Sequence, residues 1–360
     1  MRLLVVNAGS SSLRLTLLDG DDAVLAEREL DAPRAEIARA ALGEALSDRL
    51  GEADAVAHRI VHSGERFRAA VRVEAGVVEA LEELTDLAPL HQPKSLAALA
   101  AVSEVLPGTP AVACFDTAFH ATIPPEAATY ALPREWRERW PLRRFGFHGL
   151  SHAWVARCVS GSRIVSCHLG AGASLCAIRD GASVDTTMGF TPLEGLVMAT
   201  RSGSVDPGLV LWLLEHEGVT VAELAAALEH ESGLLGLAGT ADMREVVSEA
   251  ERGDDAASLA LDVYVHRLAG SVAAMAASLG GLDALVFTGG VGERSPYVRA
   301  RACERLGFLG VEVNPALNDQ SRQDADISAE GARARTLVVR AREDLEIARQ
   351  VRAALAGERL

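Results

Sequence analysis

Aromatic residues and long apolar runs are both scarce in this chain. Phe, Trp and Tyr make up 4% of the 360 residues while 49% are hydrophobic, so the cores must consist mainly of Ala, Leu and Val. No stretch stays apolar for the ~20 residues that a membrane-spanning helix needs, and the first residues lack the apolar segment of a signal peptide. These absences predict a cytoplasmic globular protein. Because one core rarely serves a chain this long, we expect two domains.

Positive charge is also in short supply. The chain has 35 Lys and Arg residues against 50 Asp and Glu residues, which gives a formal net charge of −15. Binding to nucleic acid or to an anionic membrane depends on clustered basic side chains, so neither partner is expected. An anionic substrate would have to be attracted by a local cluster of positive groups that acts against the overall field.

Cysteine is rare and shows no metal-binding spacing. The five cysteines form no C-x-x-C pair and lie in apolar sequence surroundings, at positions 114, 158, 167, 176 and 303. Their odd number favours reduced thiols in the core over a disulfide framework.

The opening of the chain, VVNAGSSSLRLTLLDG (Val5–Gly20), combines two predicted strands with a loop of small residues. Apolar residues precede the loop, and alternating leucines follow it before an Asp-Gly turn. The backbone N–H groups and hydroxyls of such a loop can hold phosphate oxygens. An ordinary hairpin loop explains the same residues, so this interpretation needs support from elsewhere in the chain.

A later segment, SCHLGAGASLCAIRDG (Ser166–Gly181), repeats the opening at a constant offset. Asn7 aligns with His168, and Gly9 aligns with Gly170. Both copies have the pattern strand, glycine-containing turn, strand, Asp-Gly turn, which indicates two duplicated domains. We expect the two phosphate-facing turns to oppose each other across a cleft.

Strands and helices alternate along the rest of the chain, which predicts an α/β architecture. The lack of a low-complexity linker predicts halves that meet at a packed hinge. Asp206-Pro207 and Thr220 have the composition of helix starts. The further predicted strands span 55–62 and 110–120, the predicted helices span 206–217, 220–230 and 254–279, and strand-then-helix units span 284–295 and 336–355.

Two charged residues lie at the ends of apolar strands. Arg59 lies in HRIVHSGERF, ahead of a glycine, and Asp116 lies in CFDTAFH. A charged side chain in an apolar strand is costly unless it is paired or functional. A structural salt bridge explains Arg59 as well as anion recognition by its guanidinium fork does. A turn-capping role explains Asp116 equally well.

Further candidates lie in glycine-rich segments and at a helix start. His148 and His152 are four residues apart, but glycines and the lack of an intervening Glu favour one histidine that donates to developing charge over a zinc pair. Arg201, in a long loop rich in glycine and threonine, is a second candidate for anion binding. Glu343 begins the last predicted helix, where the helix dipole alone explains a carboxylate. The FTGGVGERS segment fits neither the dinucleotide fingerprint nor the P-loop pattern.

Ten segments together resemble the acetate kinase family, a branch of the superfamily that contains actin, heat-shock chaperones and sugar kinases. In order along the chain they are NAGSSSL, HRIVHSGE, LAPLHQP, FDTAFH, GFHGLSH, HLGAGAS, DTTMGFTPLEGL, TRSGSVDPG, FTGGVGE and EDLEIAR. The resemblance implies two duplicated actin-like (ribonuclease H-like) α/β domains that flank a nucleotide cleft. The first would comprise residues 1–120 with the helix 345–360, and the second, residues 121–344, would bind nucleotide and form a homodimer.

The resemblance implies reversible, Mg²⁺-dependent phosphoryl transfer from ATP to acetate, which yields acetyl phosphate and ADP. Asn7 and Glu343 match the residues that organise the Mg²⁺ ion, which Mn²⁺ could replace. Arg59 and Arg201 match the pair that holds the substrate carboxylate and the transferring phosphoryl group. Because acetate is already an anionic nucleophile, the site needs positive charge around the phosphoryl group more than it needs a base.

Other positions match the family's remaining site residues. Asp116 matches an acidic residue with a catalytic or positioning role, and His148 matches the histidine that stabilises the transition state. The implied pocket for the acetate methyl group is formed by Val61, Leu90, Phe147 and Pro192. The implied nucleotide contacts are Arg14, His168, Leu169, Gly170, Ala171, Gly172, Asp242, Met243, Arg244, Gly290, Val291, Gly292, Glu293 and Arg294. We expect acetate as the best acid, propionate as the second and longer acids as poor substrates.

Three positions depart from the family pattern. Arg14 replaces a lysine, Ala171 replaces an asparagine and Arg294 replaces another asparagine. These changes leave nucleotide affinity and the choice of phosphoryl donor open, and the chain is short between its opening hairpin and Arg59. Two alternatives therefore remain: a kinase for another short acid or with another donor, and a regulator without activity that binds nucleotide or acyl phosphate.

Overall fold

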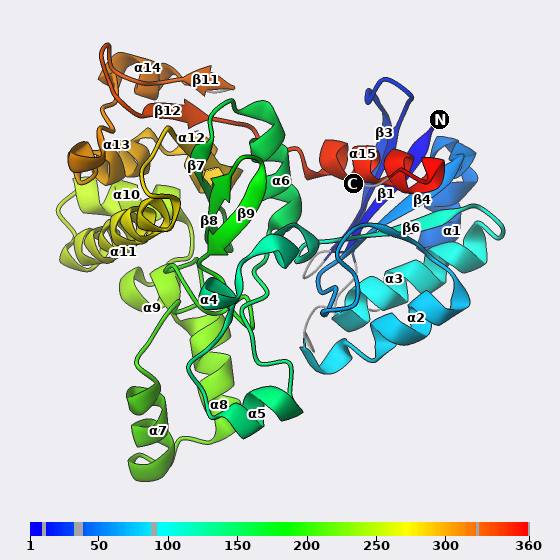
Figure 1. Ribbon diagram of the computed structural model, residues 1–360, viewed down its shortest axis with the longest axis horizontal. Helices are drawn as coiled ribbons and strands as arrows, with labels where there is room; N and C mark the ends of the chain where they lie inside the picture. Colours follow the sequence, from blue (N-terminus) through cyan, green and yellow to red (C-terminus); the bar gives the residue numbers. More distant parts are fainter. Residues whose placement is uncertain (9–11, 32–38, 88–91, 322–323, 359–360) are drawn as a thin grey trace. The chain divides into compact units, whose positions relative to one another are not determined.

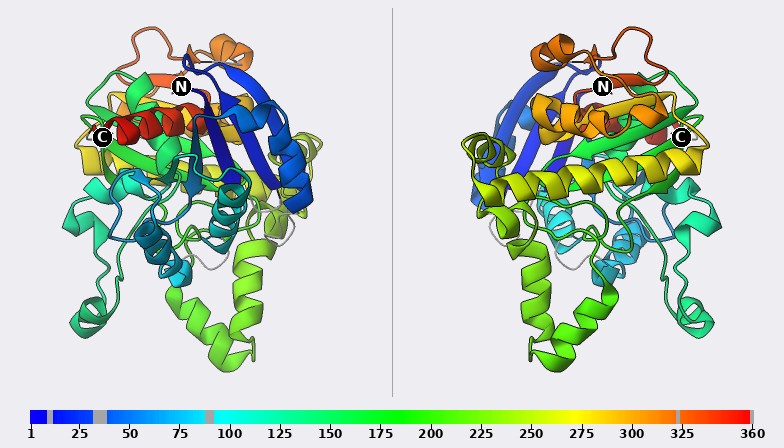
Figure 2. Two further views of the ribbon diagram at one scale, coloured as in Figure 1. Left: turned by 90° about the vertical axis from the view of Figure 1, so that its right-hand side faces the viewer. Right: turned by 90° about the vertical axis from the view of Figure 1, so that its left-hand side faces the viewer.

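The computed structural model describes residues 1–8, 12–31, 39–87, 92–321 and 324–358. Contacts divide the chain into two compact units. The first contains Met1–Ala121, His148–Trp154 and Arg342–Leu360, and the second contains Thr122–Phe147 and Val155–Ala341. Each unit contains one six-stranded sheet with helices packed against it (Figure 1, Figure 2).

The first unit is built around a mixed sheet. Its strands are β1 (Leu3–Ala8), β2 (Ser12–Leu18), β3 (Val24–Asp31), β4 (Ala55–Ile60), β5 (Val71–Arg72) and β6 (Ala111–Phe115). Its helices are α1 (Arg39–Ser47), α2 (Ala75–Glu82), α3 (Gln92–Val105) and α15 (Glu343–Ala356), with 3₁₀ turns η2 (Arg49–Glu52) and η3 (Thr85–Leu87). The strand order is β3-β2-β1-β4-β6-β5, with β1, β4 and β6 parallel at the centre.

The second unit contains most of the helices. Its strands are β7 (Arg163–Leu169), β8 (Ala173–Arg179), β9 (Ala182–Thr186), β10 (Ala284–Thr288), β11 (Ala325–Asp326) and β12 (Arg335–Val338). Its helices are α4 (Pro125–Ala128), α5 (Arg134–Arg139), α7 (Pro207–His216), α8 (Val221–Ala226), α9 (Gly233–Ala238), α10 (Met243–Glu251), α11 (Asp255–Leu279), α12 (Gly289–Arg294), α13 (Pro296–Glu304) and α14 (Pro315–Gln320). It also has the π-helical turn η5 (Ala227–Glu231) and the 3₁₀ turn η6 (Gly307–Leu309), while η4 (Ala118–Thr122) and α6 (Gly149–Cys158) have residues in both units.

The two sheets have the same topology. Starting from β9, the second sheet has the order β9-β8-β7-β10-β12-β11, with β7, β10 and β12 parallel at its centre. The antiparallel strands β1, β2 and β3 thus correspond to β7, β8 and β9, and the short antiparallel strand β5 corresponds to β11. The duplicated α/β fold predicted from the repeated segment is confirmed.

Alternate residues of the central strands in the first unit pack into opposite layers. Leu3 and Val5 of β1 pack with α15, whereas Leu4 and Val6 pack with α1 and α3. β4 and β6 follow the same alternation, because their alternate residues also pack with α15. Full burial of each Leu or Val side chain contributes roughly 1.5–3 kcal/mol. The same alternation places the following alternate residues, Asn7 after β1 residue Val5, Arg59 in β4 and Asp116 just after β6, on the face that α15 covers.

Helix starts predicted from capping residues are confirmed. The side chain of Asp206 accepts a hydrogen bond from the Gly208 N–H at the start of α7. The side chain of Asp254 also caps α11, a helix predicted from its periodicity and length and not from a cap. Thr220 and Glu223 form a reciprocal capping box at the start of α8. The side-chain oxygens satisfy N–H groups that have no partner within the helix.

Several predicted boundaries are wrong because local patterns continue past the end of an element. The predicted strand 110–120 ends at Phe115, and the 3₁₀ turn η4 follows it. The predicted helix 220–230 leaves α-helical geometry after Ala226 and continues as η5. The predicted strand-then-helix unit 284–295 consists of β10 followed directly by α12, whose first residue Gly289 has φ +77°.

Two segments pack in a different unit from the one expected. His148–Trp154 and Arg342–Asp344 were expected in the second domain, but both belong to the first unit. For the first segment the physical cause is visible: the Gly149 N–H donates to the backbone oxygen of Asp116 at 2.7 Å. The second segment carries the start of α15, which packs on the first sheet.

Four of the cysteines lie in the cores, as predicted. Cys114, Cys167, Cys176 and Cys303 are buried, and burial raises the pKa of each thiol, which keeps it protonated at neutral pH. Cys158 is exposed, so the prediction of a core position is wrong for this residue. Among the described residues, no helix is both long and apolar enough to cross a membrane.

Candidate active site

Arg59 lies near the end of β4, and its guanidinium group contacts side chains from three other parts of the first unit. Its Nε donates to both carboxylate oxygens of Asp116 at 3.1 and 3.2 Å, and its Nη2 donates to Oδ2 at 2.7 Å. Its Nη1 lies 3.3 Å from Asn7 Oδ1 and 3.3 Å from Glu343 Oε2. The structure therefore brings together four of the predicted site residues.

The sheet explains why residues so distant in the sequence meet. Asn7, Arg59 and Asp116 lie at or just beyond the carboxyl ends of three parallel strands, where open α/β sheets bind their ligands. All three continue the alternation that faces α15. Glu343 is the first residue of α15, where the helix dipole stabilises a carboxylate.

The charges of this cluster are strongly coupled. Burial opposes the charge on Arg59, but the carboxylates of Asp116 and Glu343 outweigh it and raise the pKa of Arg59. Burial raises the pKa of Asp116, and the Glu343 charge adds to this increase, while the Arg59 guanidinium opposes it. Two carboxylates share one guanidinium, so the cluster favours an additional cation.

The loop that carries His148 is packed against Asp116. His148 has φ +56° in the left-handed region, and its backbone oxygen accepts a hydrogen bond from the His152 N–H at 3.0 Å. A Cβ atom at Gly149 would collide with the backbone oxygen of Asp116. Only glycine therefore permits this approach, which fixes His148 next to the strand end that bears Asp116. His152 is buried with its ring against that of His120, at 5.7 Å between centroids.

The segment after β4 is held by buried polar contacts. Gln92 bonds both the N–H and the backbone oxygen of His62, each at 3.3 Å. The Ser63 N–H donates to Thr117 Oγ1 at 2.9 Å. Val61 is only partly buried within this segment, as a pocket residue would be. Leu90, the other pocket residue predicted near this part of the chain, lies outside the described residues, as do the loop residues Gly9, Ser10 and Ser11.

Arg201 belongs to the second unit and differs from Arg59 in its surroundings. Its side chain is partly buried, and it forms no ion pair within the part of the chain that the structure describes. Burial lowers the pKa of Arg201, although the charge of Glu229 opposes that shift. Its backbone is fixed, because the Arg201 oxygen accepts from the Met198 N–H at 3.1 Å. An arginine with this environment is available to bind an anion.

The predicted nucleotide segments lie at the ends of the parallel strands in the second unit. His168 is near the end of β7, and the Gly170 N–H donates to the Gly172 oxygen at 2.9 Å to close the next turn. The backbone oxygen of Ala171 accepts from the Ala199 N–H at 3.1 Å, which ties this turn to the Arg201 loop. Leu169 is buried and anchors the turn in the core.

The remaining predicted nucleotide residues form interacting groups. Asp242 caps α10 and binds Arg244 through backbone and side chain, and these hydrogen bonds lower the pKa of Asp242 to about 2. The charge of the Arg294 guanidinium also lowers the pKa of Asp242. The Arg294 guanidinium donates to the Gly290 oxygen at 3.1 Å.

Glu293 Oε1 accepts from the N–H groups of residues 289 and 341 at 3.1 and 2.9 Å. Met243 and Gly292 are buried, and Val291 is partly buried.

Arg14, which replaces a lysine of the family pattern, already forms an ion pair within the first unit. It lies on β2 opposite Asn7 and forms an ion pair with Glu27 of β3. The hydrogen bond that Arg14 donates to the Glu27 carboxylate is the main cause that raises the pKa of Arg14. Its charge is therefore partly neutralised within the sheet.

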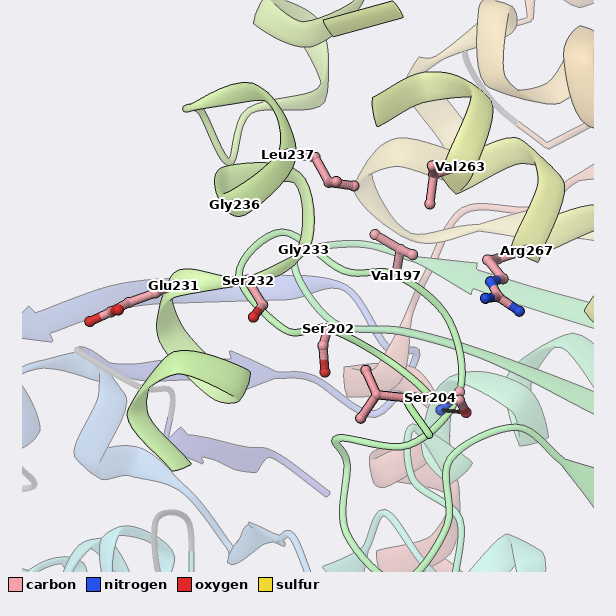
Figure 3. A pocket seen from close by; sticks show the side chains of 12 residues that line it. Val197, Ser202, Ser204, Glu231, Ser232, Gly233, Gly236, Leu237, Val263 and Arg267 are labelled. Atoms are coloured by element: carbon pink, nitrogen blue, oxygen red, sulfur yellow. Dashed lines mark hydrogen bonds between the residues drawn. The ribbon is translucent and has the colours of Figure 1, made fainter. Parts of the chain in front are cut away.

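A cavity of about 480 Å³ lies beside the Arg201 loop, within the second unit (Figure 3). Ser202, Ser204 and Ser232 line one side of it, while Val263 and Arg267 of α11 line another. Arg201 itself is not a lining residue. The sequence did not predict this cavity, because its walls come from segments that are far apart in the chain.

Sequence reasoning also missed a polar cluster in the second unit. Tyr130, Arg144 and Glu194 bind one another and the loop that bears Pro192. Arg144 precedes the predicted GFHGLSH segment, and Glu194 lies within the predicted TPLEGL segment. The closeness of Arg144 and Glu194 to these two motifs was the only signal in the sequence. Neither spacing nor composition indicated that these two residues meet each other and Tyr130.

Comparisons with known proteins agree with this architecture. A model of the acetokinase family matches residues 35–349. The chain is 40% identical to an acetate kinase of Thermotoga maritima over 98% of each protein. It superposes on an acetate kinase of Porphyromonas gingivalis with a TM-score of 0.91 and 35% identity, covering 98% of this chain and 99% of that one. A propionate kinase of Francisella tularensis gives a TM-score of 0.90 and 33% identity, with 97% and 98% coverage.

The duplicated sheets place the chain among the α/β proteins built from two actin-like domains. Within that class, the family match and the relatives decide the assignment. The chain belongs to the acetokinase family.

Proposed function

We propose that this chain is an acetate kinase, which transfers the terminal phosphoryl group of ATP to acetate and reverses the reaction from acetyl phosphate and ADP. The observation that carries the proposal is the cluster of Asn7, Arg59, Asp116 and Glu343. These side chains meet in a member of a family whose similar relatives are named acetate kinases. We also propose a cytoplasmic location, on the family assignment and the predicted reduced thiols.

Arg59 would orient acetate as it approaches the phosphate chain, once a bound cation offsets the second carboxylate of the cluster. Its Nε and Nη2 are bound to Asp116, so the guanidinium is held in one orientation before substrates arrive. A charge oriented in advance stabilises developing negative charge without reorganisation during the reaction. Asp116 then acts as a positioning residue for Arg59. Acetate needs no base, because it is already ionised at neutral pH.

The side-chain oxygens of Asn7 and Glu343 fit a Mg²⁺ ion. Both present oxygen atoms to the same guanidinium nitrogen, and amide and carboxylate oxygens are the hard ligands that Mg²⁺ takes. No group of three or more His, Cys, Asp or Glu suited to a metal occurs among the described residues. These two side chains would therefore share the ion with water and nucleotide phosphates, and its charge would neutralise the phosphate oxygens.

His148 and Arg201 would supply the remaining donors. His148 is fixed by the close contact between Gly149 and Asp116, and Arg201 forms no ion pair among the described residues. Phosphoryl transfer spreads charge over three equatorial oxygens, and fixed cationic donors stabilise that charge. The roles of these two residues therefore lie in the transition state more than in substrate binding.

The nucleotide would bind to the second unit, through residues 168–172, 242–244 and 290–294. The turn at Gly170 and the start of α12 offer backbone groups at the ends of parallel strands, as phosphate-binding turns do. Ala171 offers no side-chain amide, and Arg294 is bound to the Gly290 oxygen. We therefore expect weaker discrimination among nucleotide donors, with ATP still accepted.

A second candidate activity is propionate kinase, because a propionate kinase has nearly the same fold at 33% identity. Hydroxylamine trapping of the acyl phosphate, over a matrix of acetate, propionate and butyrate with several donors, separates the two. We expect the highest kcat/KM for acetate with Mg-ATP. A preference for propionate would replace the assignment. Binding of Mg-ATP without hydroxamate from any acid would favour an inactive regulator.

We further propose that the protein forms a homodimer through the second unit. The support is a group of large apolar side chains that α7, α8 and their flanking loops leave exposed by 40–74%, namely Val205, Leu209, Leu211, Trp212 and Val221. Exposed apolar patches of this kind mark association surfaces. Trp212→Glu should therefore convert the protein to a monomer in light-scattering measurements, and an unchanged mass would rule out this surface.

A further inference from the structure

Three side chains of the second unit form a connected cluster at the glycine-rich loop 187–195. Glu194 Oε1 accepts from Arg144 Nη2 at 2.7 Å, and Glu194 Oε2 accepts from the Tyr130 hydroxyl at 2.5 Å. The Arg144 guanidinium also lies 5.7 Å from the centre of the Tyr130 ring. Each member thus contacts the other two.

The same cluster binds the backbone of the loop. Arg144 Nη1 donates to the oxygens of Thr187 and Met188 at 3.0 and 3.1 Å. The Tyr130 hydroxyl accepts from the Phe190 N–H at 2.9 Å. Tyr130 therefore uses its single oxygen to join the Glu194 carboxylate to the loop backbone. Burial raises the pKa of Tyr130, and the hydrogen bond that its hydroxyl donates to Glu194 raises it further, so the hydroxyl keeps its proton.

Gly189 lies where the loop approaches the cluster most closely. A Cβ atom at this position would collide with the Glu194 carboxylate and the Tyr130 hydroxyl. The Gly189 oxygen accepts from the N–H groups of Phe145 and Gly146 at 3.0 and 3.3 Å. The loop 187–195 and the segment 143–147 are therefore bound to each other as one piece.

These two segments carry two residues of the proposed acid pocket. Phe147 ends the segment 143–147 and is buried, and Pro192 lies in the loop between Phe190 and Glu194. A partly buried ion pair adds little net stability, because desolvation offsets most of the attraction. Because the ion pair itself adds little stability, the network is better explained by the geometry that it maintains between the two segments.

We propose that Tyr130, Arg144 and Glu194 are positioning residues that set the acid chain length the enzyme accepts, by holding the loop with Pro192 against the segment with Phe147. This inference rests on the proposed acyl-kinase function. When the loop is held, the pocket cannot widen to admit additional methylene groups. When it is released, Pro192 can move away and longer acids fit.

Two variants test the proposal in the full-length protein. Tyr130→Phe removes only the hydroxyl that joins Glu194 to the loop, and Arg144→Lys keeps the charge but loses the guanidinium fork. We expect both to raise the ratio of kcat/KM for butyrate to that for acetate by about tenfold or more, because butyrate has two more methylenes than acetate and each commonly provides at least about tenfold discrimination. KM for Mg-ATP should stay unchanged. Hydrogen exchange in peptides that cover 187–195 should become faster.

The control is Asp283→Asn, which breaks another arginine–carboxylate pair of the same unit, Arg163–Asp283. It should leave the butyrate-to-acetate ratio and the exchange of 187–195 unchanged. General loss of stability would lower the rates with all acids together and leave their ratio constant. If the wild type is active and both cluster variants keep its butyrate-to-acetate ratio of kcat/KM, this inference is overturned and the proposed function is not. A wild type that forms no hydroxamate with any acid overturns the proposed function and this inference with it.

Discussion

Arg59 and Asp116 extend from adjoining parallel strands, and a guanidinium edge made of Nε and Nη2 binds the Asp116 carboxylate. The third guanidinium nitrogen, Nη1, lies near Asn7 Oδ1 and Glu343 Oε2. Asp116 is also fixed through its backbone, because its N–H donates to the Ile60 oxygen at 3.1 Å and its own oxygen accepts from Gly149. Asp116 thus determines the direction in which the Nη1 group of Arg59 points.

Asp116→Asn should remove the charge that orients Arg59 while it preserves the shape of the side chain. We expect kcat/KM for acetate to fall by about 10²-fold or more, the usual loss when a fixed electrostatic group is removed. Steady-state kinetics with hydroxamate detection provide the measurement. Asp262→Asn, which removes an exposed partner of Arg301, is the control and should be active. Activity close to wild type in Asp116→Asn would show that Arg59 does not depend on it.

Arg201→Ala should lower kcat by orders of magnitude and leave KM for acetate within a few-fold of wild type. The reason is that an interaction made only in the transition state appears in kcat. Arg267→Ala serves as a matched control, because Arg267 is another arginine of the second unit without an ion pair among the described residues. Near-normal turnover of Arg201→Ala would mean that another residue stabilises the phosphoryl group.

Val61→Ala should broaden the range of acids with only a small loss of rate. Removal of two methyl groups from a partly buried pocket wall leaves room for propionate and butyrate, and one methylene changes discrimination by about 1–3 kcal/mol. The measurement is the ratio of kcat/KM values for the three acids. Val73→Ala, a similar truncation in the apolar cluster around β5, should leave that ratio unchanged. The pocket assignment fails if the two variants behave alike.

The buried side chain of His58 should make the folded protein less stable in mild acid. It is buried on β4, neither ring nitrogen has a hydrogen-bond partner among the described residues, and burial lowers the pKa of His58 to about 4. Between pH 6.5 and 4 the unfolded chain therefore binds a proton that the folded chain does not. The free energy of unfolding should be fully retained above pH 6.5 and fall as pH decreases, by up to about 1.4 kcal/mol per pH unit for one proton.

Urea unfolding at several pH values between 7.5 and 4.5 tests this expectation. His58→Leu should reduce the pH dependence, because the titrating group is gone. His216→Gln, at an exposed position in α7, should leave it unchanged. Burial lowers the pKa of His62 to about 4 as well, so part of the dependence should remain in His58→Leu. Identical pH profiles for His58→Leu and wild type would contradict the assignment.

Local features of the chain were predictable because they depend on neighbouring residues. Asp206 and Thr220 start helices through contacts two and three residues away, and these contacts are encoded in a short stretch of sequence. The repeated hairpin was equally visible, because Asn7 and His168 belong to copies with the same order of strand, turn and strand. Element ends were less predictable: apolar residues continue past Phe115, while the backbone leaves the sheet there.

The site itself was only partly predictable. Family resemblance identified Arg59, Asp116 and Glu343 individually, but their direct contact depends on the order of the parallel strands and on the return of α15 to the first unit. No local signal indicated Gly149 as the residue that permits the approach to Asp116, because the clashing atom belongs to a distant backbone. The cluster of Tyr130, Arg144 and Glu194 was missed for the same reason.

The amino-acid sequence by itself determined the α/β class, the duplication, the helix caps and the types of residue that handle a carboxylate and a phosphate. Those features follow from periodicity, from short-range hydrogen bonds and from side-chain chemistry, all of which act within a few residues. Only the tertiary structure decided that one guanidinium is shared by Asp116, Asn7 and Glu343, and that Gly189 binds two loops together. Such contacts arise when strands pair and helices pack, so their partners are set by the sheet and not by distance along the chain.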